Sequence, residues 1–208
     1  MNNKCETYDI IISLVKSLKN KTEDGKYEHF IKEEYEGKPL ILWGTAYLLN
    51  QFLRQLEIPK SRRLVSKKAD ALWKSLVGDE DINDYYYQDK VTVKHDGKVK
   101  KYSGASKTPY FDGEIKTGSS FTFKDVFHEE HIVPIAVIIN DLEELEKANK
   151  LDYKHVDEVL KKIYICRMLK EEDRKIKERY KRANNKDDVV RDVYNQYEIY
   201  LVEKQRLI

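Results

Sequence analysis

One stretch of the chain, residues 119–175, combines neighbouring acids and histidines with short apolar runs. Between Phe127 and Pro134, two imidazoles and two carboxylates occupy four consecutive positions, 128–131. Further along, the apolar segment Ile163–Cys166 leads into three consecutive acids at positions 171–173. This order predicts a strand, a long insertion, a second strand and an acidic helix start.

The first of these strands is expected to end near Pro134, because β-branched residues precede it and proline lacks the N–H that continues a ladder. Side chains alternate along a strand, so His128 and Glu130 share one face while Glu129 and His131 share the other. A kink or turn is therefore needed if neighbouring residues are to serve one site.

The chemistry of these residue types favours a metal-assisted hydrolase. An imidazole is able to accept a proton from water near neutral pH, and carboxylates hold hard divalent cations. A simpler interpretation also exists for each part of the pattern. The acids at 171–173 are typical of helix capping and dipole compensation, and the histidines fit a half-exposed loop.

Together, Glu130-His131-Ile132-Val133-Pro134 and the later strand and helix resemble the HNH, or ββα-metal, nuclease family. That family has two antiparallel strands followed by a helix, with a metal ion between them. The resemblance implies His131 as general base and Glu130 as metal ligand. It also implies further candidates for the remaining positions: Glu171 and Glu172 as helix ligands, Asp173 ranked below them, His128 as an additional ligand or phosphate contact, and Asn140 as the bracing asparagine.

The resemblance further implies a phosphodiesterase that acts on double-stranded DNA with Mg²⁺ or Mn²⁺. A short chain with an extra helical region is similar to sequence-specific restriction-type (type II) or phage-type enzymes, which often work as homodimers. Tyr194, Tyr197 and Tyr200 offer a candidate self-interface, with packing against the chain's own core as the alternative. Cys5 and Cys166 form no CxxC pair, so no structural zinc is expected.

The expected fold class is α+β, with the ββα-metal motif inside a mostly helical chain that also carries a β-hairpin. Asp96-Gly97, between alternating runs in Lys90–Tyr102, is the hairpin signal. A helical, DNA-binding or scaffold region is expected over residues 1–78, and the catalytic region with C-terminal helices over 79–208, in one compact unit. The expected segments include a short helix at Tyr27–Tyr35 and helices at Leu40–Leu56, Arg62–Val77, Leu169–Arg182 and Lys186–Leu207.

Charge supports a nucleic-acid partner only locally. Charged residues make up 37% of the 208 residues, yet the net charge is only +2. A basic cluster at Arg62, Arg63, Lys67 and Lys68 is the candidate DNA-phosphate surface, and a solvated helix face is the competing interpretation. No apolar run is long enough to cross a bilayer, so no membrane partner and a cytoplasmic location are expected.

Two other functions fit the same residues. The chain is an alternative candidate for a non-catalytic nucleic-acid-binding protein that uses the same basic helices. It also fits a small regulatory protein whose His–Glu cluster is a structural metal clip, which would lose thermal stability on chelation.

Overall fold

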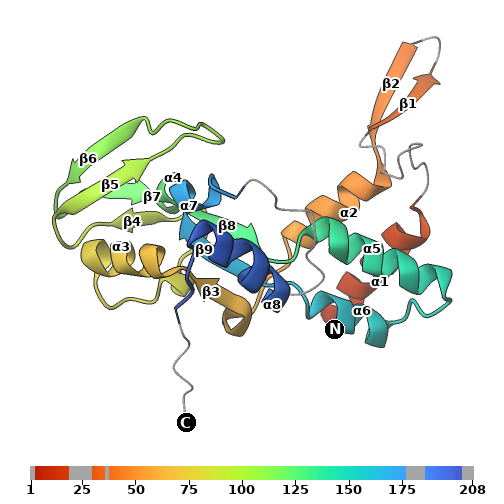
Figure 1. Cartoon of the computed structure of the whole chain (residues 1–208). Coiled ribbons are helices and arrows are strands. Elements are labelled where there is room, and N and C mark those ends of the chain that lie inside the picture. Colours follow the sequence, from red (N-terminus) through yellow and green to blue (C-terminus); the bar gives the residue numbers. More distant parts are fainter. Residues whose placement is uncertain (1–2, 19–29, 36–37, 177–185, 203–208) are drawn as a thin grey trace. The chain divides into compact units, whose positions relative to one another are not determined.

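The computed structural model describes residues 3–18, 30–35, 38–176 and 186–202. The chain forms two compact units, each built from two separate segments: Met1–Glu57 with Val133–Ile163, and Ile58–Ile132 with Tyr164–Ile208 (Figure 1). The division expected at residues 78 and 79 therefore falls inside the second unit. The helix Lys67–Val77 packs against the strand Ile165–Leu169, so both sides of the expected division belong to the same unit.

The first unit is mainly helical. It contains α1 (Asn3–Lys16), α2 (Thr45–Arg54), α5 (Ile135–Lys147), α6 (Tyr153–Leu160) and the antiparallel pair β1 (Phe30–Tyr35) and β2 (Lys38–Trp43). Buried side chains at helical spacing, such as Leu49 and Leu53 on α2, face its core. The carboxylate of Asp152 caps α6 by accepting the N–H of His155 at 2.9 Å.

One expected helix of this unit was wrong in kind and another was wrong at its start. The segment Phe30–Tyr35 is a strand, and the helix expected from Leu40 begins only at Thr45. Short apolar runs such as Leu40–Trp43 fit a buried strand or a helix equally well by periodicity alone. Pairing along the β1–β2 ladder decides in favour of the strand.

The second unit carries the remaining elements. In chain order they are η1 (Lys60–Arg62), β3 (Arg63–Val65), α3 (Lys67–Val77), η2 (Ile82–Asp84), β4 (Lys90–Thr92), β5 (Gly97–Lys101), β6 (Phe111–Ile115), β7 (Ser120–Thr122), α4 (Phe123–Val126), β8 (Phe127–His131), β9 (Ile165–Leu169), α7 (Lys170–Asp173), α8 (Lys186–Asp188), η3 (Val189–Tyr194) and η4 (Asn195–Tyr197). The protein is thus α+β with small sheets.

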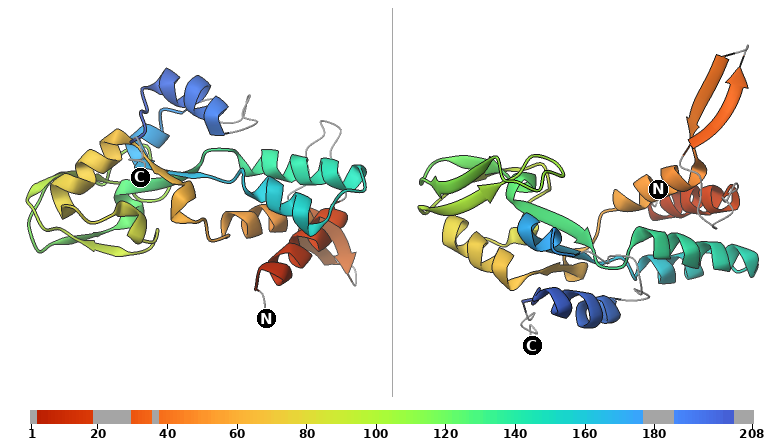
Figure 2. Two further views of the ribbon diagram at one scale, coloured as in Figure 1. Left: turned by 90° about the horizontal axis from the view of Figure 1, so that it is seen from below. Right: turned by 45° about the horizontal axis from the view of Figure 1, so that its top comes forward.

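A three-stranded sheet of order β3-β9-β8 lies at the centre of this unit (Figure 2). Strand β8 runs antiparallel to β9, with Glu130 opposite Cys166 and His128 opposite Met168, while β3 runs parallel to β9. The connection from β8 to β9 contains α5 and α6 of the first unit, so the two strands pair across a long insertion.

The expected β-hairpin at Asp96-Gly97 was wrong. Strand β4 pairs with β7 and strand β5 pairs with β6, so the two alternating runs do not pair with each other. The carboxylate of Asp96 accepts hydrogen bonds from the backbone N–H and the hydroxyl of Thr117, both at 2.8 Å. These bonds lower the pKa of Asp96 to about 2 and join its turn to the loop before β7.

The C-terminal segment covers one face of the central sheet. Val189, Tyr194 and Ile199 are buried against Cys166 and Met168 of β9. The helix expected to continue to Leu207 ends earlier, because Glu198 adopts a left-handed backbone conformation with φ 56°. Tyr194 therefore packs in the chain's own core, whereas Tyr200 is 54% exposed.

The opposite face of the sheet packs on an aromatic core. Trp73 of α3 contacts Phe127 and Phe123 with ring centroids 5.8 and 6.1 Å apart. Arg167 of β9 lies on this face, fully buried, with its guanidinium 5.0 Å from the Phe123 ring centre. It donates to the Glu129 carboxylate at 2.7 Å and to the Tyr85 carbonyl at 2.6 Å.

Because Arg167 joins both strands to the loop after η2, Arg167→Ala should lower the free energy of unfolding by about 3–5 kcal/mol, the usual cost of leaving a buried charge unpaired. Urea unfolding followed by circular dichroism measures this loss. Arg191→Ala, which removes an exposed arginine paired with Asp188 and Asp192, is the control and should leave stability unchanged. Equal effects of the two variants would contradict a structural role for Arg167.

Candidate metal centre

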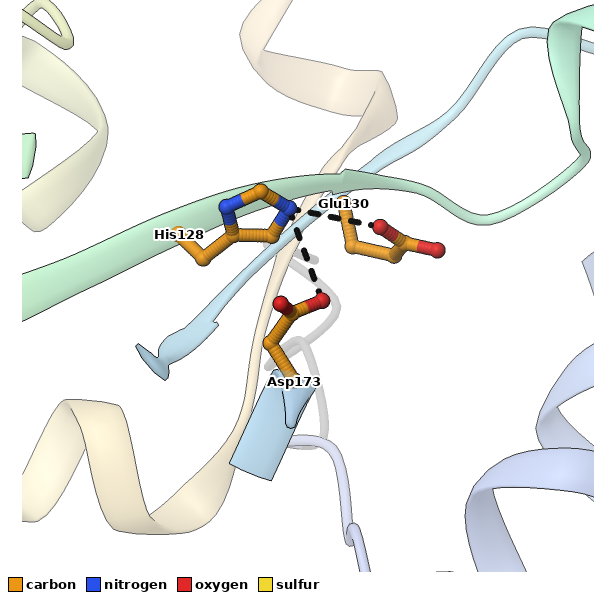
Figure 3. A group of neighbouring side chains, drawn as sticks. All are labelled: His128, Glu130 and Asp173. Atoms are coloured by element: carbon orange, nitrogen blue, oxygen red, sulfur yellow. Dashed lines mark ion pairs between the residues drawn. The ribbon is translucent and has the colours of Figure 1, made fainter. Parts of the chain in front are cut away.

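Three side chains from β8 and α7 converge in the second unit. Figure 3 shows the imidazole of His128 directed toward two carboxylates, that of Glu130 on the same strand and that of Asp173 on α7. The His128 Nε2 atom lies 3.4 Å from Glu130 Oε2 and 3.5 Å from Asp173 Oδ1. All three side chains are partly buried, with exposed fractions of 27%, 17% and 14% for His128, Glu130 and Asp173.

Strand alternation explains why these residues meet. His128 and Glu130 are two positions apart on β8 and so project from the same face. Glu129, between them, projects from the other face and binds Arg167. The two neighbouring glutamates therefore have different roles: Glu129 holds the core together, and Glu130 enters the cluster.

Capping of α7 decides which of the three later acids joins them. The carboxylate of Glu172 turns back to the start of the helix, where it accepts the N–H of Leu169 at 2.9 Å and the hydroxyl of Ser66 at 2.6 Å. It is only 2% exposed. Asp173, the next residue, faces β8 instead. The sequence ranked Glu171 and Glu172 above Asp173 as metal ligands, so the observed order is the reverse.

A helix-capping rule would have excluded Glu172 as a ligand from the sequence alone. Glutamate at the third position of a helix commonly accepts the N–H of the residue before the helix. Once the helix start is placed at Lys170, this rule assigns Glu172 to the cap and leaves Glu171 and Asp173 as candidate ligands. Glu171 points elsewhere, since its carboxylate lies 3.4 Å from the ammonium group of Lys100.

The other expected site residues lie outside the cluster. His131 is the last residue of β8, and the next residue continues the pairing through an N–H bond from Ile132 to the carbonyl of Tyr164 at 3.0 Å. Asn140 is an exposed residue of α5 in the first unit. Neither supplies a ligand to the group formed by His128, Glu130 and Asp173.

The expected basic surface is only partly available for a ligand. Arg63 donates to the backbone carbonyls of Ile58 and Asn83, at 2.7 and 3.0 Å, which gives it a structural role. Lys67 and Lys68 are exposed on the first turn of α3. Arg62, at the end of η1, is half-buried.

The donor set of the cluster suits a divalent cation. One imidazole nitrogen and two carboxylate oxygens lie within 4.8 Å of one another. Carboxylates bind Mg²⁺ and Mn²⁺ well, and an added imidazole favours a first-row transition metal over Mg²⁺. Burial, followed by Cys166, Glu130 and Asp173, raises the pKa of Tyr194, so the negative charge of the cluster extends to the face covered by the C-terminal segment.

Asp173→Asn should weaken Mn²⁺ binding by at least about tenfold, because loss of a residue that only supports a metal ligand already costs about 10–100-fold. Isothermal titration calorimetry of the full chain measures the affinity. Glu171→Gln removes a neighbouring carboxylate outside the cluster and should bind Mn²⁺ as the unaltered chain does. Weaker Mn²⁺ binding by Glu171→Gln, together with unchanged binding by Asp173→Asn, would make Glu171 the ligand.

Glu172→Ala should destabilise the second unit by about 1–3 kcal/mol, since two buried donors lose their shared acceptor. Thermal and urea unfolding measure this loss. The affinity for Mn²⁺, measured well below the unfolding transition, should remain close to that of the unaltered chain. A variant of normal stability that no longer binds Mn²⁺ would show that Glu172 is a ligand instead.

Among the residues that the structure describes, no helix is long and apolar enough to cross a membrane. Comparisons of the chain with models of protein families, with curated proteins and with solved structures found no significant match. The resemblance to the HNH nucleases therefore rests on the residues of the sequence alone.

Proposed function

We propose that the protein is a metal-dependent endonuclease that hydrolyses phosphodiester bonds in DNA. The observation that carries this proposal is the placement of His128, Glu130 and Asp173 where two antiparallel strands meet the helix that follows them. This order of strand, strand and helix is the one that the ββα-metal resemblance implies.

Glu130, Asp173 and His128 would hold the ion, which would supply a Lewis acid for a phosphoryl oxygen and its leaving group. His131 is proposed to accept the proton of the attacking water. Imidazole has the side-chain chemistry for this step near neutral pH. Strand alternation places His131 on the face of β8 opposite to His128 and Glu130, and its Nε2 atom is buried, so this role requires the end of the strand to turn toward the ion when DNA binds. The two histidines thus have separate proposed roles, one in holding the ion and one in moving a proton.

The experiment is incubation of plasmid and phage DNA with the protein in Mg²⁺, Mn²⁺ or EDTA. Cleavage with either ion and none in EDTA supports the proposal, and discrete fragments support sequence-specific cutting of the restriction type. Smeared products would indicate a non-specific nuclease. Intact DNA under every condition would remove the proposal and leave a non-catalytic binding protein.

The two histidines are separated by single substitutions. His131→Ala should lower the rate of cleavage by about 10²–10⁴-fold, the usual contribution of general base catalysis, while Mn²⁺ affinity stays the same. His128→Ala should lower both the rate and the Mn²⁺ affinity, because it removes one of three ligands. The assignment of the base fails if His131→Ala cleaves at the normal rate.

A further inference from the structure

A cleft opens directly beside the His128–Asp173 pair. It has a volume of about 880 Å³, and His128 and Asp173 form part of its lining. The rest of its wall comes from α4, from Lys170 and Arg174 at the two ends of α7, from the loop between β5 and β6, and from Tyr87 and Gln88 before β4. Its volume falls within the range of about 300–1,000 Å³ that is usual for small-molecule sites, so it has room for a nucleotide-sized group rather than a whole duplex.

Basic side chains dominate this cleft. They are Lys107, Lys124, Lys170 and Arg174, against the carboxylates of Asp125 and Asp173. Asp125 accepts a hydrogen bond from the hydroxyl of Tyr110 at 3.1 Å. The positive charge therefore lies next to the candidate metal ligands, where a negatively charged substrate would have to sit.

Two of the four cations are fixed in place by the fold. The ammonium group of Lys170 donates to the carbonyls of Tyr102 and Gly104 at 3.2 and 3.4 Å, and burial lowers its pKa. The Arg174 guanidinium stacks 3.8 Å from the ring centre of Tyr102. Its Nη1 atom is buried and forms no hydrogen bond to any residue that the structure describes.

The other two cations are available at the cleft. Lys107 is exposed, Lys124 is half-exposed, and neither ammonium group forms an ion pair with the described part of the chain. Exposed lysines elsewhere in this unit are of both kinds: Lys60, Lys94 and Lys116 are paired with acids, whereas Lys90 and Lys98 form no ion pair with the described part of the chain. Unpaired cations beside a fixed guanidinium are a typical arrangement for phosphate recognition.

We propose that this cleft binds the phosphate groups of the DNA strand on one side of the bond to be cut, with Lys107, Lys124 and Arg174 as the contacts. This inference rests on the proposed function. It places the substrate strand beside the cluster and gives the α3 lysines no part in holding it.

The test is the binding of fluorescent DNA in EDTA, where no metal-dependent cleavage takes place, measured by anisotropy over a range of salt concentrations. Lys107→Ala/Lys124→Ala should weaken binding by about tenfold or more, because the variant removes two charge-assisted hydrogen bonds to phosphate. The slope of log K against log salt should become shallower by roughly 0.9 for each duplex phosphate that the variant no longer neutralises, or 0.7 on a single strand. The measurement is repeated with duplex DNA, with its separated strands and with RNA of the same sequence. The comparison shows which nucleic acid supplies the bound phosphates.

Lys90→Ala/Lys98→Ala is the matched control, because it removes two exposed lysines of the same unit that do not line the cleft. Equal reductions in affinity for both variants would show a general charge effect and overturn the inference. A reduction found only in Lys67→Ala/Lys68→Ala would move the binding surface to α3 and overturn it as well. Arg174→Lys, which keeps the charge but changes the donor geometry, should weaken binding less than the double variant.

The outcome of this binding test does not depend on whether the protein cleaves DNA. If the unaltered chain cleaves DNA and the cleft variant binds normally, the cleft inference fails and the proposed function stands. If the chain binds DNA through the cleft and cleaves nothing with any ion, the proposed function fails and the cleft remains a phosphate-binding site.

Discussion

Pairing between β8 and β9 is the constraint on which the rest of the second unit depends. It brings residues on either side of a long insertion into register, so that Glu130 faces Cys166 and Glu129 faces Arg167. The buried guanidinium of Arg167 binds Glu129 and two backbone carbonyls, which fixes one face of the sheet against the aromatic core. The other face is thereby left to carry the His128 and Glu130 side chains.

The three acids of α7 also have separate roles. The first turn of this helix contains three acids, and an isolated helix would place all of them near its positive end. Tertiary contacts give each a separate partner: Lys100 for Glu171, Ser66 for Glu172 and His128 for Asp173. Two hydrogen bonds to Oε2 hold the buried Glu172 carboxylate at the helix start, and only Asp173 is directed toward the strand.

The distribution of charge joins the cluster to the cleft beside it. Two carboxylates attract cations, and four basic side chains around the adjoining space attract anions. A phosphodiester with a divalent ion satisfies both requirements, whereas a cation or an anion alone satisfies one. The net charge of +2 conceals this local arrangement, because acids elsewhere in the chain balance it.

The sequence by itself determined the α+β class, the acid–histidine strand, the later strand and the acidic helix start, because strand alternation and helix caps are local properties. It identified His128, Glu130 and Asp173 as candidates. It did not decide among them or give the bounds of the two units, and it wrongly favoured a hairpin for the runs around Asp96-Gly97. Those outcomes depend on side-chain partners that are distant in the sequence: Arg167 for Glu129, Ser66 for Glu172 and Thr117 for Asp96. Long-range partners of this kind leave no periodic signal in the sequence, so only the tertiary structure decided them.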